Sequence, residues 1–110
     1  DAFTDSNDVT VENGIVTFNS TDSWISFTLD FGTDNVAKAS VYVQEPNNSG
    51  QIYIYVDNLS KQVSTIYNLG NGSWTESSND CSISSGGSRT VYVKANKAGI
   101  KLDWLKFMKN

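Results

Sequence analysis

Residues 24–31 read Trp-Ile-Ser-Phe-Thr-Leu-Asp-Phe, and an apolar side chain occupies every odd-numbered position of that run. Successive side chains of a β-strand point to opposite faces, so this alternation predicts a strand with one buried face. The same pattern recurs in three further apolar sets: Ala39, Val41 and Val43; Ile52, Ile54 and Val56; Val91 and Val93. We therefore expect these side chains to share one core between layers of sheet.

The rest of the chain also favours an all-β fold. Shorter strands are predicted at residues 63–67 and 73–77 and a closing strand at 99–107, with clusters of Gly, Asn, Asp and Ser between the runs. A flexible loop is predicted at 82–88, and no apolar stripe of helical period is long enough for a helix. About eight or nine strands, spaced roughly 8–12 residues apart, indicate a single sandwich or barrel domain over residues 1–110.

Composition excludes several classes of protein. The chain of 110 residues has a formal net charge of −4, no histidine and one cysteine, Cys81. An acidic chain without a basic stripe lacks the usual features of a nucleic-acid binder, and no apolar run reaches the ~18 residues of a membrane-spanning helix. Without histidine there is no Ser-His-Asp or Cys-His arrangement and no imidazole metal site. Cys81 has no partner for an internal disulfide and is expected to be a buried free thiol.

The faces opposite the predicted core carry aromatic residues among polar ones. Trp24, Tyr42, Tyr53 and Tyr55 all fall on outward positions. Aromatic rings with a polar group suit a ligand that is apolar on one side and hydroxylated on the other, as a pyranose ring is. The alternative is that these rings form cross-strand pairs that stabilise the sheet.

Trp74 follows a glycine-rich turn at residues 69–72. A tryptophan at a loop edge with small polar neighbours is typical of a binding surface, because loops carry much of the function of a fold. The alternative is that Trp74 covers one end of the sandwich.

The acidic residues do not indicate an enzyme. A glycosidase needs two carboxylates that flank one bond at a set separation, and nothing in the sequence places two acids in that way. Asp103 is a separate case, because alternation puts it on the same face as Leu105 and Phe107. A carboxylate that points toward a core needs a partner or a metal, and calcium prefers such oxygen ligands. A salt bridge or a hydrogen bond at Asp103 is the alternative.

The chain resembles the family 6 carbohydrate-binding modules over nearly all of its length. The resemblance rests on five segments in order: Val-Thr-Val-Glu-Asn-Gly at 9–14, the run from Phe18 through Trp24 to Leu-Asp-Phe-Gly at 32, Gly-Gln-Ile-Tyr-Ile-Tyr-Val-Asp at 50–57, Gly-Ser-Trp at 72–74, and Lys-Leu-Asp-Trp-Leu-Lys-Phe at 101–107.

The resemblance implies a fold and a ligand class. The fold is an all-β jelly roll, a β-sandwich of two antiparallel sheets, appended as a monomeric module to a secreted polysaccharide-degrading enzyme. Family members bind xylan, cellulose fragments, β-glucans or agarose.

The resemblance also implies two sites and a metal. Glu12, Phe18, Trp74 and Lys101 would form a loop site, with a sugar held between Phe18 and Trp74. A second site on a concave sheet face would use Trp24, Tyr53, Tyr55 and Tyr42. A structural calcium ion would be held by Asp1 and Asp103. The family usually has tyrosine in place of Phe18 and asparagine in place of Lys101, which favours the concave face over the loop site.

Two functional hypotheses follow. The first is a non-catalytic module that binds a β-linked polysaccharide by aromatic stacking and directs an attached glycoside hydrolase to it. The second is a structural or protein-interaction β-sandwich whose aromatic face docks a neighbouring domain, since exposed aromatic patches also mark protein interfaces.

Overall fold

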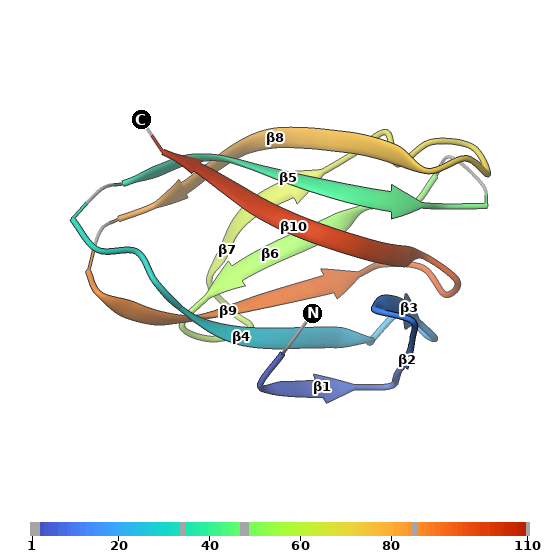
Figure 1. Ribbon diagram of the computed structural model, residues 1–110, viewed down its shortest axis with the longest axis horizontal. Helices are drawn as coiled ribbons and strands as arrows, with labels where there is room; N and C mark the ends of the chain where they lie inside the picture. The colour runs from blue at the N-terminus through green and yellow to red at the C-terminus, as the bar shows by residue number, and fades with distance from the viewer. Residues whose placement is uncertain (1–2, 34, 47–48, 85, 110) are drawn as a thin grey trace.

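The computed structural model describes residues 3–33, 35–46, 49–84 and 86–109 (Figure 1). Ten strands lie within these ranges: β1 Asp5–Asn7, β2 Val9–Glu12, β3 Ile15–Phe18, β4 Trp24–Asp30, β5 Val36–Gln44, β6 Ile52–Val56, β7 Gln62–Ile66, β8 Thr75–Ile83, β9 Ser88–Ala95 and β10 Lys101–Lys109. The described part of the chain contains no helix that is long and apolar enough to cross a membrane.

The strands form two antiparallel sheets of five strands each. One sheet, called sheet A below, has the order β1-β4-β9-β6-β7, and the other, sheet B, has the order β2-β3-β10-β5-β8. Figure 1 shows β5, β8 and β10 in one layer and β4, β9, β6 and β7 in the other. The predicted all-β sandwich of two antiparallel sheets is confirmed.

The core lies between the two sheets. The apolar sets that the alternation assigned to the inside are fully or almost fully buried: Ala39, Val41, Val43, Ile52, Ile54, Val56, Val91 and Val93. Phe27 and Leu29 of β4 pack against the same cluster and remain partly exposed. Cys81 is buried and free, as predicted, and its burial raises the pKa of the thiol to about 11.

Strand β8 was predicted wrongly in length. The pattern gave a short strand at residues 73–77 and a loop from residue 82, whereas β8 runs over Thr75–Ile83 and pairs with β5 along most of its length. The inward positions of β8 hold Ser77, Asn79 and Cys81 before Ile83, so the strand lacks the apolar alternation by which the others were found.

Polar side chains close one flank of the sandwich, where β7 of sheet A meets β8 of sheet B. Ser64 Oγ donates to the main-chain oxygen of Asp80 at 2.6 Å, and Asn79 Nδ2 donates to that of Thr65 at 2.8 Å. Ser77 Oγ donates to the main-chain oxygen of Asn68 at 2.5 Å. The bonds from Ser77 and Asn79 satisfy side chains that β8 turns inward, and the bonds of Ser64 and Asn79 join β7 directly to β8.

We expect the Ser77→Ala substitution to lower the free energy of unfolding by about 1–2 kcal/mol, because it leaves the Asn68 carbonyl without its donor. Ser78→Ala is the matched control, since Ser78 is the next residue of β8 and is exposed; its effect should stay within about 0.5 kcal/mol. Urea unfolding followed by tryptophan fluorescence measures both. Equal effects of the two substitutions would show that the bond from Ser77 to the loop after β7 contributes nothing.

Candidate functional site

The outer face of sheet A carries four aromatic side chains on three adjacent strands. Trp24 comes from β4, Tyr92 from β9, and Tyr53 and Tyr55 from β6; all four are half-buried. We call this set the four-ring surface. Trp24, Tyr53 and Tyr55 were predicted from the sequence and Tyr92 was not. The same alternation contained the signal, because buried Val91 and Val93 on either side force Tyr92 outward.

Strand register places the four rings in two adjacent rows. In the first row, Lys94 of β9 lies between Trp24 and Tyr53. In the second row, Tyr92 lies between Ser26 and Tyr55. Because neighbouring strands are about 4.8 Å apart, each row spans roughly 10 Å, enough for a flat ligand to touch more than one ring.

The rings of this surface cover one another very little. Trp24 and Tyr92 meet edge to face, with centroids 5.5 Å apart and an interplanar angle of 73°. In that arrangement the edge of one ring meets the face of the other, so the two rings are not stacked face to face. Burial raises the pKa of the Tyr55 phenol, and the nearby Tyr53 adds to the rise, which is consistent with two tyrosine side chains side by side on β6.

Polar groups border the four-ring surface at both ends. At one end Tyr53 donates its hydroxyl hydrogen to Gln51 Oε1 at 2.9 Å, which leaves the amide nitrogen of Gln51 as a donor. At the other end Arg89 holds Asp57 by two bonds, Nη2 to Oδ2 at 2.7 Å and Nε to Oδ1 at 3.2 Å. The hydrogen bond from Arg89 lowers the pKa of the Asp57 carboxyl, with a further contribution from Lys61.

Tyr42 was assigned to the same face as Trp24, and this assignment is wrong. Tyr42 lies on β5 of sheet B, on the opposite side of the sandwich. Its ring is stacked between two tryptophans, with centroids 5.3 Å from Trp74 at 26° and 5.6 Å from Trp104 at 13°. Lys106 Nζ lies 5.1 Å from the centroid of Trp104, so the rings of sheet B are largely in contact with the protein itself.

The predicted loop site is not formed as expected. Phe18 has no exposed surface, because it is the last residue of β3 and points into the core, so it cannot hold a sugar against Trp74. Glu12 and Lys101 are exposed, but they lie on β2 and β10, with β3 between them. Lys101 is opposite Gln44, and Gln44 Nε2 donates to the oxygen of Gly72 in the loop before Trp74. The structure therefore brings Lys101 near the Trp74 loop and leaves Phe18 out.

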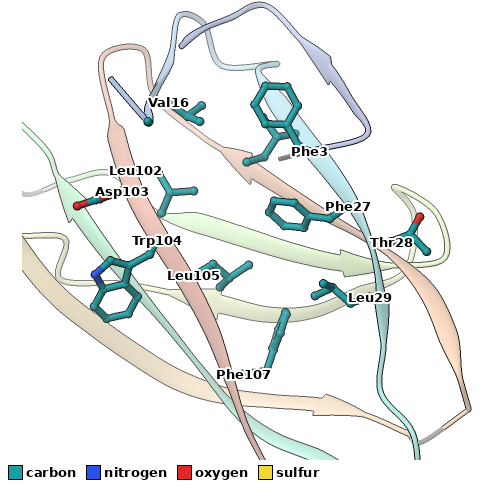
Figure 2. Close-up of a pocket in the computed structure, with 12 residues that line it drawn as sticks. Phe3, Val16, Phe27, Thr28, Leu29, Leu102, Asp103, Trp104, Leu105 and Phe107 are labelled. Carbon is teal, nitrogen blue, oxygen red and sulfur yellow. The ribbon is translucent and has the colours of Figure 1, made fainter. Parts of the chain in front are cut away.

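Asp103 does not point into the core, contrary to the sequence analysis. The pairing of β10 with β5 shifts register between Leu102 and Trp104, and this irregularity turns Asp103 to the exposed side. Figure 2 shows Asp103 and Trp104 projecting from the side of β10 opposite to Leu102 and Leu105. Its predicted partner Asp1 lies outside the described residues.

The described residues do not fit a calcium site. No group of three or more His, Cys, Asp or Glu side chains within the described ranges is placed to hold a metal ion. Asp103 alone offers two carboxylate oxygens, whereas calcium takes 6–8 oxygen ligands.

An apolar hollow of about 320 Å³ opens between the sheets on the flank opposite β7 and β8. Among the described strands, β3 pairs with β10 only as far as Leu102, and β1 pairs with β4 only as far as Ser26. Past these residues β10 and β4 are the edge strands of their sheets, and the hollow lies between them. Figure 2 shows Phe27 and Leu29 facing Leu105 and Phe107 across it. This lining offers few hydrogen-bonding groups for a hydroxylated ligand, which favours the four-ring surface as the candidate site.

Comparison with known proteins places the chain in a family. The sequence model described as carbohydrate binding module (family 6) matches residues 2–109. No curated protein sequence matches the chain.

Solved structures share the fold. A family 6 module from Clostridium stercorarium, in complex with cellobiose, is 16% identical with a TM-score of 0.81, covering 98% of this chain and 88% of that chain. The C-terminal family 6 module of a laminarinase from Zobellia galactanivorans is 19% identical with a TM-score of 0.82, covering 98% and 94%. A family 36 carbohydrate-binding module, solved with calcium and xylotriose, is 11% identical with a TM-score of 0.67, covering 84% and 79%.

Proposed function

The chain belongs to the family 6 carbohydrate-binding modules, and from this premise we propose that it binds a β-linked polysaccharide on the four-ring surface of sheet A. Modules of this family bind without catalysis, so the chain is a binding module and not an enzyme. The polysaccharide is of the xylan, β-glucan, cellulose or agarose type. The observation that carries this choice of surface is the contrast between the rings of the two sheets.

The rings of sheet A make fewer contacts with one another than the rings of sheet B do. Trp24, Tyr92, Tyr53 and Tyr55 share one edge-to-face contact, whereas Tyr42 is covered on both sides by Trp74 and Trp104. A sugar would have to displace ring contacts worth about 0.5–1.5 kcal/mol per pair on sheet B. On sheet A the four rings form one edge-to-face pair, so a sugar has no stacked pair to separate, and Gln51 and Tyr53 lie at the border to meet its hydroxyls.

The mechanism is stacking combined with a small number of directed hydrogen bonds. The apolar C–H face of a pyranose lies on an aromatic ring, and its hydroxyls exchange hydrogen bonds at the polar border. The sheet fixes the rings before the ligand arrives, so little side-chain entropy is lost on binding. Because only a few sugar units reach the rings, we expect dissociation constants of about 1 μM to 1 mM.

We also propose that the module serves an attached, secreted glycoside hydrolase by keeping it near its substrate. The support is that the laminarinase relative carries its family 6 module at its C-terminus. A weak module still raises the local concentration of an attached enzyme, because the second encounter becomes intramolecular.

Trp24→Ala should lower the affinity for the bound polysaccharide about tenfold or more, since it removes one stacking platform, and Tyr55→Ala should lower it severalfold. Trp74→Ala is the matched control: the same change at a half-buried tryptophan on sheet B, with affinity expected within about twofold. Affinity electrophoresis in gels containing xylan, β-glucan or agarose, with pull-down on cellulose, measures all three, and circular dichroism checks folding.

A larger loss of affinity in Trp74→Ala than in Trp24→Ala would contradict the proposal. Loss of binding in Trp74→Ala with retention in Trp24→Ala would place the site on the loops. No retardation of the wild-type chain in any polysaccharide would remove the proposed ligand class altogether.

Calcium is the subject of a separate test. The sequence predicted a structural ion at Asp1 and Asp103, and the described donors do not form such a site. If Asp103 holds calcium, the melting temperature should be higher in calcium chloride than in EDTA, since a ligand stabilises only the state that binds it, and Asp103→Asn should abolish that rise. An equal melting temperature in both buffers would contradict the predicted site.

A further inference from the structure

A single cation lies among the rings of the four-ring surface. Lys94 of β9 is flanked in its row by Trp24 on β4 and Tyr53 on β6, and it shares its strand face with Tyr92. Its side chain is 29% exposed. Most of the side chain is therefore covered, as is usual for a lysine that packs its aliphatic stem along neighbouring side chains and keeps its ammonium group toward solvent.

The present partner of Lys94 holds it weakly. Lys94 Nζ lies 3.9 Å from Asp22 Oδ1, at the outer limit of an ion pair, and the Asp22 side chain is 83% exposed. Exposed pairs of this kind contribute little, because both charges remain hydrated. A ligand carboxylate can take the place of Asp22 at Lys94 with little loss.

The other charged side chains on or beside this face are engaged or distant. Arg89 is bound to Asp57 through two hydrogen bonds, and Lys61 pairs with the same carboxylate at 3.4 Å. Asp5 belongs to β1, two strands away from β9, which puts it roughly 10 Å to the side. Among the described residues of the four-ring surface, Lys94 is thus the cation best placed to meet a charge on the ligand.

We infer that Lys94 makes the four-ring surface selective for an acidic β-linked glycan, in which a uronic carboxylate pairs with the ammonium group while a neighbouring sugar lies on the rings. This inference rests on the proposed function. Beyond that function, the ligand is an acidic glycan, and Lys94 is the residue that selects it. An equatorial carboxylate projects from the rim of a sugar ring, so a sugar stacked on Trp24 or Tyr53 can direct it toward Lys94, which lies between them in the row.

The test compares one polysaccharide with its own neutral form. Isothermal titration calorimetry measures the affinity for glucuronoxylan and for the same polymer after carboxyl reduction. The difference between the two affinities gives the contribution of the ligand carboxylate. The wild-type chain should bind the acidic form about fivefold more tightly. Lys94→Gln should abolish that preference and leave affinity for the reduced polymer within about twofold. Lys38→Gln on β5 of sheet B, exposed and with the same change in net charge, should keep the preference.

A second variant separates recognition from support of the surface. Asp22→Asn removes the competing carboxylate and keeps the main-chain oxygen that Asn7 Nδ2 contacts at 3.1 Å. If Lys94 reads the ligand, Asp22→Asn strengthens binding of the acidic polymer while Lys94→Gln weakens it. If the pair only stabilises the surface, both variants weaken binding to both polymers, which overturns the inference.

Three outcomes are therefore distinguishable. Equal binding of both polymers by the wild-type chain, lost in Trp24→Ala, overturns the role of Lys94 and keeps the proposed function. If the wild-type chain binds neither polymer, and also fails to bind β-glucan, agarose and cellulose, the proposed function itself is overturned. A sulfated xylan bound more tightly than glucuronoxylan through Lys94 overturns the assignment of a carboxylate and indicates a sulfate group in its place.

Discussion

Burial of the branched aliphatic side chains between the two sheets is the constraint on which the rest of the structure depends. Ile52, Ile54 and Val56 are buried completely or nearly so, and each contributes roughly 1.5–3 kcal/mol of hydrophobic stabilisation relative to exposure. Because strand side chains alternate, fixing these residues inward also fixes Tyr53 and Tyr55 outward. A shift of one residue in β6 would bury the tyrosines and expose the isoleucines. The ligand surface is thus held in place by the core beneath it.

Because the inward residues of a strand fix its outward residues, the sequence could predict both sets. Alternation is local, so it identified the inward sets and the outward direction of Trp24, Tyr53 and Tyr55 without knowledge of the fold. It could not say to which sheet a strand belongs, and Tyr42 was therefore placed with the wrong rings. Pairing between strands distant in sequence decides that question, and Tyr42 is opposite Trp104 of β10, far along the chain.

The other errors arise where a strand departs from regular geometry or regular composition. The register shift in β10 turned Asp103 outward against the alternation, and bulges leave no clear trace in a single sequence. Strand β8 carries inward Ser77 and Asn79, whose burial is acceptable because Thr65 of β7 and Asn68 in the loop after it accept their hydrogen bonds. Phe18 was expected in a loop site by resemblance, yet its position at the end of β3 sends the ring into the core. In each case a tertiary contact outweighs the local pattern.

The overall charge of the chain sets a limit on how an acidic glycan can be recognised. A net charge of −4 repels a polyanion, so Lys94 cannot act by attraction at long range. At physiological ionic strength the Debye length is about 8 Å, and most of this repulsion is screened before the ligand reaches the surface. The contact with Lys94 forms inside that distance, beside rings that exclude part of the water, where screening is weaker. Lys94 therefore distinguishes acidic from neutral glycans by slowing dissociation of the bound acidic glycan. Stacking on Trp24 and the tyrosines supplies most of the affinity for both.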